Sequence, residues 1–210
     1  MKRLLLIDDH EVVREGVKRI LGEQPGTFAF GEASNAVTAL RLVQEQDWDL
    51  AVLDLSLDGR GGLDLLNELK RLRPQLPVLI LSVHSEEQYA KRAFKAGASG
   101  YVTKDSPRDE LATAIQRVLC GGRYVSRSLA ETLIDDMAQG TDGPPHECLS
   151  GREFEVMRLI ASGKTVGEIA ELLSLSDKTI STYRARILEK MDLKNNAELT
   201  HYAIQNRLTG

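Results

Sequence analysis

Apolar and polar positions follow two different patterns along this chain, and the change falls near residue 121. Before it, short apolar runs alternate with stretches in which apolar residues recur every three or four positions. Short apolar runs ended by polar residues are typical of buried parallel strands, and the longer period is typical of amphipathic helices. Five strand–helix units predict an α/β domain with a doubly wound parallel sheet. The expected strands cover residues 2–7, 28–33, 49–54, 77–82 and 99–103.

Helix-start signals support this division and continue where the strand signals stop. In a capping box, a Ser, Thr or Asn and a residue three positions later satisfy backbone N–H groups at the first turn. Four short helices are expected after residue 148, and a tight turn at residues 173–176 separates the second from the third, as in a helix-turn-helix. The expected caps are Ser85 with Gln88, Ser106 before Pro107, Ser150 with Glu153, Thr165 with Glu168, Ser176, and Asn195 with Glu198.

A helix is also expected over residues 126–139, followed by Gly-Thr-Asp-Gly-Pro-Pro at 140–145, a run that no regular element would tolerate. We therefore expect an α/β domain at 1–121, a helical linker and flexible hinge at 122–147, and an all-α domain at 148–210. The helix-turn-helix proper would cover about 165–184.

Composition and charge narrow the function classes. The chain is 42% hydrophobic and 28% charged, which is ordinary for a globular protein. No apolar stretch approaches the roughly 18 residues of a membrane span, and the early acidic pair excludes a secretory signal, so we expect a cytoplasmic protein without membrane contact. Cys120 and Cys148 read as incidental thiols. The net charge of −4 excludes indiscriminate nucleic-acid binding, although residues 150–210 carry nine basic and eight acidic side chains.

Carboxylates follow two of the expected strands. Asp8 and Asp9 close the first, and Asp54 closes the third. Because the carboxyl ends of parallel strands lie at one edge of the sheet, we expect these side chains to meet there. Crowded carboxylates repel one another and require a cation, and Mg²⁺ prefers oxygen ligands. The sequence predicts a phosphoryl-transfer pocket.

Ser82 and Lys104 extend this set, because they end the fourth strand and follow the fifth. Taken singly, an acidic pair could be a solvated loop and Lys104 an ordinary surface lysine. Polar residues at the matching ends of four strands favour a site.

These residues resemble the receiver domain of bacterial response regulators, which has a flavodoxin-like (βα)5 fold. The resemblance covers the first 120 residues. Its motifs are Leu-Ile-Asp-Asp-His at 6–10, Leu-Asp-Leu-Ser-Leu at 53–57, Ser82, and Tyr-Val-Thr-Lys at 101–104.

The resemblance implies that Asp54 accepts a phosphoryl group from a sensor histidine kinase. It also implies that Mg²⁺ is held by Asp8, Asp9, Asp54 and the Ser56 backbone carbonyl. Ser82, Lys104 and Tyr101 would form the switch, although Tyr101 could also be a half-buried aromatic at a strand end.

Two residues near this site leave questions open. Asp58 stands where the family usually has proline, which would make its loop more flexible. His84, two residues after Ser82, is close enough to influence an attacking water, but a solvent-facing loop histidine is the alternative reading.

Residues 149–208 resemble the LuxR-type helix-turn-helix of NarL/FixJ response regulators. The motifs are Leu-Ser-Gly-Arg-Glu at 149–153, Leu-Ile-Ala-Ser-Gly-Lys at 159–164, Glu-Ile-Ala at 168–170, and Leu-Ser at 175–176 followed by Lys-Thr-Ile at 178–180. The resemblance implies double-stranded DNA as the partner. In the third helix, Ile180, Ile187, Leu188 and Met191 would face the core.

The opposite face of that helix would contact DNA. By family correspondence, Ser181, Thr182 and Ala185 occupy base-reading positions. Lys178, Arg184 and Arg186 would meet phosphates, with Thr179 on the same helix and Thr165 before the second helix as further contacts. Tyr183 stands where the family often has histidine, and the two asparagines at 195–196 depart from a commonly basic stretch. A module of net charge +1 binds weakly alone, so a homodimer on paired half-sites is expected.

The sequence therefore predicts a phosphorylation-switched transcription regulator. It would be no enzyme apart from self-catalysed phosphoryl uptake and autodephosphorylation. One alternative is an enzyme that passes phosphate to a small molecule, which would need a cap domain that the short loops do not provide. Another is a phosphorylation-independent regulator whose receiver is only an interaction or dimerisation module.

Overall fold

The computed structural model describes residues 1–24, 26–57, 61–83, 86–126, 130, 144–206 and 208–209, with only the backbone at 86–88. The chain divides into two compact units between residues 140 and 141. Each is described by itself. Among the described residues, no helix is both long and apolar enough to cross a bilayer.

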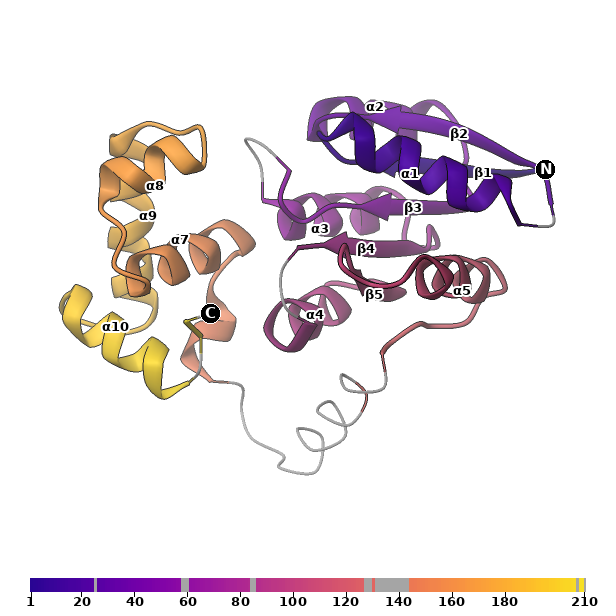
Figure 1. Ribbon diagram of the computed structural model, residues 1–210. Coiled ribbons are helices and arrows are strands. Elements are labelled where there is room, and N and C mark those ends of the chain that lie inside the picture. The colour runs from indigo at the N-terminus through magenta and orange to yellow at the C-terminus, as the bar shows by residue number, and fades with distance from the viewer. Residues whose placement is uncertain are drawn as a thin grey trace. The chain divides into compact units, whose positions relative to one another are not determined.

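The first unit is built on one five-stranded sheet (Figure 1). All neighbouring strands are parallel, in the order β2-β1-β3-β4-β5. Every predicted strand is confirmed to within one residue at each end. The strands are β1 (Lys2–Ile7), β2 (Phe28–Ala33), β3 (Leu50–Leu53), β4 (Val78–Ser82) and β5 (Gly100–Thr103).

Helices cover both faces of the sheet, as a doubly wound fold requires. The helices of this unit are α1 (Glu11–Gly22), α2 (Ala36–Glu45), α3 (Gly62–Leu72), α4 (Glu86–Lys95) and α5 (Arg108–Leu119). Alternate strand residues pack against α1 and α5 on one face, because side chains alternate along a strand. Contacts of α3 with α2 and α4 mark the other helical layer. The α1/α5 core contains Leu4, Leu6, Leu50, Val52, Leu79, Leu81 and Val102 with Val17, Leu21, Leu111 and Ile115.

The expected start of α5 is wrong by one residue. Pro107 is the N-cap and the helix begins at Arg108, with no side-chain cap. The Ser106 hydroxyl instead contacts the Thr103 hydroxyl at 3.0 Å, because it lies one position too early to reach the helix N–H groups. The capping box expected at Ser85 lies outside the described residues.

Residues beyond 121 still pair with this sheet. Tyr124 forms a parallel bridge with Gly100, and its hydroxyl donates to Glu110 Oε1 at 3.0 Å. Most of the helix expected over 126–139 lies outside the described residues. Of the residues that are described, Ala130 N–H donates to the Ser126 carbonyl at 3.0 Å. Of the expected irregular run at 140–145, only Pro144 and Pro145 are described. Pro145 begins a short 3-10 helix, η1 (Pro145–Cys148), so the expectation of no regular element is wrong there. Proline suits a first helical turn, whose N–H groups have no helical partner.

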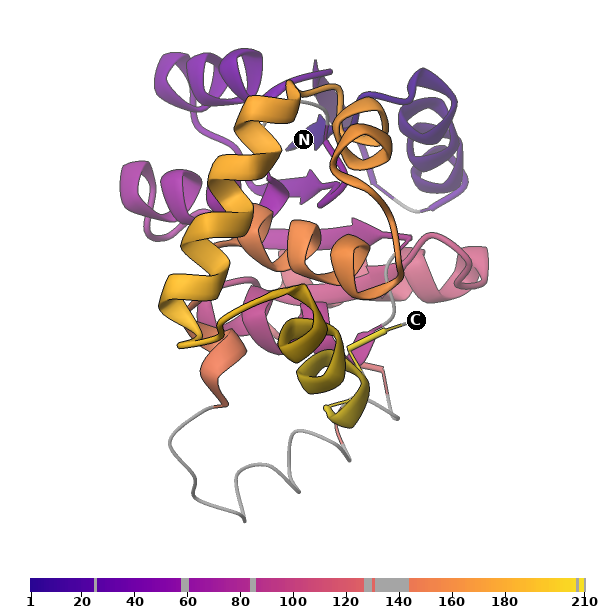
Figure 2. The ribbon, with the colours of Figure 1, turned by 90° about the vertical axis from the view of Figure 1, so that its left-hand side faces the viewer.

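The second unit contains the four predicted helices after η1. They are α7 (Gly151–Ala161), α8 (Val166–Leu172), α9 (Asp177–Lys190) and α10 (Asn196–Gln205). Helix α7 contacts the other three and forms the centre of the unit (Figure 2). Three of its apolar side chains, Phe154, Val156 and Met157, are fully buried.

The predicted capping residues start these helices. Complete capping boxes form at Ser150 with Glu153 and at Thr165 with Glu168. Ser176 caps α9, and Asn195 caps α10. The last box is incomplete, because Glu198 Oε2 accepts from Lys194 N–H instead of from the capping residue.

Candidate functional site

The sheet brings the predicted polar residues of the first unit together. Asp8 follows β1, Asp54 follows β3, and Lys104 follows β5, while Ser82 is the last residue of β4. Lys104 Nζ lies 2.8 Å from Asp8 Oδ2 and 2.8 Å from Asp54 Oδ2. Asp8, Asp54 and Ser82 are 4%, 1% and 0% exposed. Three strand ends thus contribute to one buried cluster of charges.

The backbone on either side of Asp54 is fixed. Its N–H donates to the Ile7 carbonyl at 2.8 Å, and its Oδ1 accepts from Ser56 N–H at 3.0 Å. Gly62 closes the loop by donating to the Leu55 carbonyl at 3.1 Å. A Cβ at Gly62 would lie 2.4 Å from Leu55 Cα, so only glycine fits this approach. Sequence reasoning missed Gly62, because a single glycine before a helix is a weak signal.

Burial controls the electrostatics of this cluster. Burial raises the pKa of the Asp54 carboxyl, and the hydrogen bonds from Lys104 and Ser56 only partly oppose that rise. Burial alone would lower the pKa of Lys104, but its bonds to Asp54 and Asp8 outweigh burial and raise the pKa. The ammonium therefore stays charged at neutral pH and is the main counter-ion of two buried carboxyls.

Asp9 lies beside this cluster and is joined by His10, which sequence reasoning did not single out. His10 Nδ1 is 2.8 Å from Asp9 Oδ1 and 3.3 Å from Asp8 Oδ1. One ligand atom from each of Asp8, Asp9, His10 and Asp54 lies within 4.8 Å of the others. His10 directly follows the acidic pair in the sequence, and this position could have identified it as a neighbour of the site.

The donor set fits a hard divalent cation such as Mg²⁺. Three carboxylates from two adjacent strand ends face one place, and oxygen ligands are what Mg²⁺ prefers. In the described part of the chain, Asp8 Oδ2 and Asp9 Oδ1 are buried without a hydrogen bond of good geometry, and their near neighbours are the cationic Lys104 and the His10 ring. Ser56 contributes its N–H to Asp54, and a metal bond from its carbonyl stays a prediction.

The predicted switch residues are placed in part. Ser82 is fully buried, and its carbonyl accepts from Lys104 N–H at 2.8 Å. Tyr101 is fully buried in β5, so the half-buried alternative is wrong for this structure. Its expected rotation stays a prediction. His84 and Asp58 lie outside the described residues.

The second unit presents a helix-turn-helix. Helices α8 and α9 are joined by residues 173–176, and Ser174 adopts a left-handed φ of 51° in this turn. Ile180 and Ile187 are fully buried and Met191 is 6% exposed, as predicted for the inner face of α9, while Leu188 is only half-buried. The opposite face exposes Lys178, Ser181, Thr182, Ala185 and Arg186.

Three predicted DNA-contact residues also make contacts within the unit. Arg184 Nε donates to Asn196 Oδ1 at 2.6 Å, which ties α9 to the start of α10. Thr165 Oγ1 caps α8, and Thr179 Oγ1 lies 2.8 Å from the Ser176 hydroxyl. These side chains orient the helices, whereas the exposed residues of α9 are available to a ligand.

Two adjacent buried residues at the start of α7 hold both helices of the motif. Arg152 Nη2 donates to the Leu173 carbonyl at 3.3 Å, at the end of α8. Glu153 Oε2 accepts from Lys190 Nζ at 2.6 Å, in the last turn of α9. Lys190 keeps the pKa of Glu153 low, although burial opposes this. Sequence reasoning recognised Glu153 only as a helix cap, because tertiary pairing leaves no local pattern.

Comparison with known proteins agrees with this division. Residues 4–116 match the family described as the response regulator receiver domain, and residues 147–203 match bacterial regulatory proteins of the luxR family. The response regulator UvrY of Escherichia coli (strain K12) is 35% identical over 99% of this chain and 96% of its own.

Solved structures of RcsB are also similar. RcsB from Salmonella enterica serovar Typhimurium, bound to a promoter in the presence of phosphomimetic BeF3⁻, has 25% identity and a TM-score of 0.63, covering 96% of this chain and 97% of its own. A structure of two RcsB dimers bound to two parallel DNAs has 25% identity and a TM-score of 0.61, covering 96% of this chain and 97% of its own.

Proposed function

This chain belongs to the two-component response regulators, with a receiver domain and a luxR-family domain, and from that premise we propose that phosphorylation of Asp54 switches its binding to DNA. The observation that carries this proposal is the buried contact of Lys104 with both Asp8 and Asp54 at 2.8 Å. Burying three charged groups lowers the free energy of unfolding, and such clusters occur mainly at functional sites.

The chemistry follows from where these atoms lie. An Asp54 carboxylate oxygen attacks the phosphorus of a phosphohistidine on a sensor kinase, the P–N bond breaks, and the imidazole leaves. Lys104 offsets negative charge on the phosphoryl oxygens as they approach, as cations do in phosphoryl transfer generally. Mg²⁺, held by Asp8, Asp9, Asp54 and the Ser56 carbonyl, would supply further charge neutralisation. Water later hydrolyses the acyl phosphate and restores the carboxylate.

The switch starts from the charge gained at Asp54. An acyl phosphate adds roughly −1.5 to −2 of charge and new acceptor oxygens. Lys104, which already contacts Asp54 at 2.8 Å, and the hydroxyl of the buried Ser82 would donate to these oxygens, and Tyr101 on the neighbouring strand would take up the displaced space. Phosphorylation would shift the population of receiver conformations, and the second unit would respond to that shift.

The DNA-binding surface in this proposal is the exposed face of α9. Ser181, Thr182 and Ala185 are short and exposed, which allows the helix to approach base edges. Lys178 and Arg186 would contact phosphates, with Arg184, Thr179 and Thr165 at the margins.

The charge of the second unit also bears on its assembly. Residues 150–210 carry a net charge of only +1, which favours a homodimer on paired half-sites. The dimers of RcsB on DNA support this assembly. Promoter DNA, a sensor kinase and a cytoplasmic setting are parts of the same proposal.

The phosphorylation-independent alternative is not favoured, because the receiver retains an assembled set of buried charges that a simple docking module would not need. Incubation with acetyl phosphate and Mg²⁺, followed by intact-mass measurement, tests the proposal. We expect one added phosphoryl group on the native chain, none on Asp54→Asn, and normal labelling of Asp47→Asn, a control at an exposed carboxylate. Labelling of Asp54→Asn to the native level would contradict it.

A further inference from the structure

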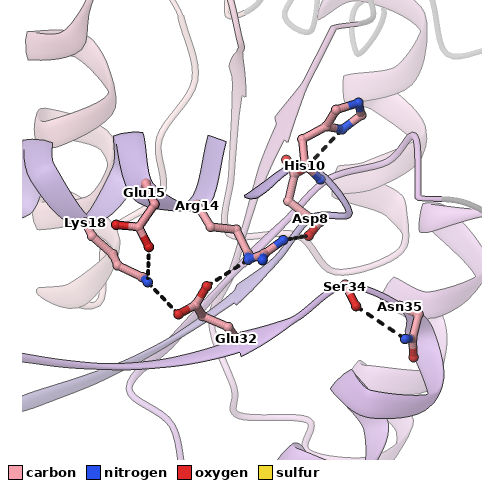
Figure 3. A network of polar contacts seen from close by, with 8 residues as sticks. All are labelled: Asp8, His10, Arg14, Glu15, Lys18, Glu32, Ser34 and Asn35. Carbon is pink, nitrogen blue, oxygen red and sulfur yellow. Dashed lines mark hydrogen bonds and ion pairs between the residues drawn. The ribbon is translucent and has the colours of Figure 1, made fainter. Parts of the chain in front are cut away.

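Arg14 lies on the first helix beside the acidic site, and no role for it follows from the chemistry above. Figure 3 shows its guanidinium between the backbone of Asp8 and the side chain of Glu32. Arg14 Nη1 donates to the Asp8 carbonyl at 2.7 Å, and Arg14 Nε donates to Glu32 Oε2 at 2.8 Å. Only 13% of the Arg14 side chain is exposed.

The sheet explains why the Asp8 carbonyl requires this donor. Asp8 N–H donates to the Ala33 carbonyl at 3.1 Å, which continues the β1–β2 ladder one step beyond its last pair. The carbonyl of a strand residue points to the same side as its N–H, so the next bond should also come from β2. Strand β2 ends at Ala33, and the chain then turns into α2, whose first turn is capped by the Asn35 side chain accepting from Thr38 N–H at 2.9 Å. Arg14 supplies the donor that a longer β2 would have supplied.

The bond to the carbonyl fixes the orientation of the peptide that joins Asp8 to Asp9. The same residue is also held through its side chain, because His10 N–H donates to Asp8 Oδ1 at 2.8 Å. With its N–H, carbonyl and carboxylate all bonded, Asp8 leaves little freedom to the backbone of Asp9. The direction of the Asp9 carboxylate therefore depends on the contact with Arg14.

The charges around Arg14 balance locally. Glu32 also contacts Lys18, and Lys18 Nζ lies 2.6 Å from Glu15 Oε1. Hydrogen bonds from Lys18 and Arg14 lower the pKa of Glu32, and bonds to Glu15 and Glu32 raise the pKa of Lys18. Two cations thus face two anions. The net electric field of these four side chains at the acidic site is therefore small. They affect Asp8 through the hydrogen bond that Arg14 donates to its carbonyl.

We propose that Arg14 is a positioning residue of the phosphorylation site: its guanidinium replaces the absent β2 donor at the Asp8 carbonyl, and thereby aims the Asp9 carboxylate at the cation. The inference rests on the proposed function, because it assigns Asp9 to the cation site. Arg14 itself touches neither the cation nor the phosphoryl group.

Magnesium titration of Arg14→Gln, followed by calorimetry, tests this inference. Loss of one charge-assisted hydrogen bond should weaken Mg²⁺ binding about threefold to tenfold. A purely electrostatic role predicts the opposite sign, since removing a positive charge near a cation site tightens binding. Arg14→Lys keeps the charge but not the fork that joins two acceptors, so it should weaken binding as well. Arg19→Gln removes an exposed charge from the same helix and should leave binding unchanged.

A second pair of variants separates the loss of the contact that holds Arg14 from the loss of a negative charge nearby. Glu32→Gln removes the anion that holds Arg14, whereas Glu15→Gln removes an equal charge that contacts only Lys18 among the residues of Figure 3. Glu32→Gln should weaken Mg²⁺ binding more than Glu15→Gln. Equal effects of the two variants would contradict the proposal, as would native-like binding by Arg14→Lys.

Amide resonances distinguish failure of this inference from failure of the proposed function. In metal-free protein, Arg14→Gln should shift the Asp9 and His10 amide signals, and Arg19→Gln should not. If the native chain binds no Mg²⁺, the proposed site fails whatever these signals do. If it binds Mg²⁺ and the amide signals of Arg14→Gln match the native ones, Arg14 does not position Asp9. Urea unfolding of each variant shows that the folded protein is being compared.

Discussion

Replacement of Lys104 by methionine should destabilise the metal-free protein strongly, because it removes the cation from two buried carboxylates. Lys104 Nζ lies 2.8 Å from both Asp8 Oδ2 and Asp54 Oδ2. At an effective dielectric constant of about 20, each contact corresponds to about 6 kcal/mol of Coulomb attraction. The ammonium regains its hydration in water, so breaking such a buried pair costs about 3–5 kcal/mol net.

Proton binding limits this cost and makes it depend on pH. The variant can neutralise Asp54, whose pKa burial already raises. For an ordinary aspartate pKa of about 3.9 in the unfolded chain, that protonation costs about 4 kcal/mol at pH 7 and about 1.5 kcal/mol at pH 5. The expected loss in free energy of unfolding is therefore about 3–4 kcal/mol at pH 7 and about 1–2 kcal/mol at pH 5.

Urea unfolding in EDTA at the two pH values measures this loss. Lys70→Met is a matched control, because Lys70 donates to the Leu76 carbonyl at 2.9 Å and is the lysine of α3. It should cost about 1 kcal/mol at both pH values. Saturating Mg²⁺ should stabilise Lys104→Met more than the native chain, since the cation then replaces the lost ammonium. An equal loss for Lys104→Met at pH 7 and pH 5, or no loss at pH 7, would show that Lys104 is not the counter-ion of the two carboxylates.

Three further predictions concern the second unit. Glu153→Gln should lower the free energy of unfolding by about 1–2 kcal/mol at pH 7, because it breaks the contact with Lys190. The pKa of Glu153 lies below its ordinary value of 4.5, so this contribution exists above that value and should fade as pH falls through the folded-state pKa. Ser174→Gly should raise stability by about 0.5–1 kcal/mol, because φ is 51° there. Lys178→Ala and Arg186→Ala should each reduce the slope of log affinity for DNA against log salt by about one.

Each of these has a clear contrary result. A deficit of Glu153→Gln that stays constant from pH 7 to pH 3 would exclude the ion pair as its cause. A less stable Ser174→Gly in thermal unfolding would mean that the left-handed turn carries no strain. Unchanged salt slopes for the two α9 variants would place phosphate contacts elsewhere on the unit.

The sequence predicted the fold well where the burial of a single strand or helix determines its pattern of apolar residues. Residues 4–7 of β1 and 50–53 of β3 are all buried, and their continuous apolar runs directly reflect that burial. The convergence of Asp8, Asp54 and Lys104 followed from the rule that parallel strands end at one edge.

Contacts between elements left no such pattern. Nothing in the local sequence indicates that Arg14 meets the Asp8 carbonyl or that Arg152 meets the Leu173 carbonyl. Both depend on where separate elements end in space. The prediction that no regular element includes Pro145 was wrong for another reason. Proline disfavours the interior of a helix and yet suits its first turn.

The most direct test of the account is selection of bound sequences from random DNA, with and without a beryllofluoride complex that mimics the phosphoryl group. We expect the native chain to select paired half-sites and to bind them more tightly with the complex, whereas Asp54→Asn should show no such gain. The same affinity with and without beryllofluoride, or an equal gain for Asp54→Asn, would contradict the claim that charge at Asp54 controls DNA binding.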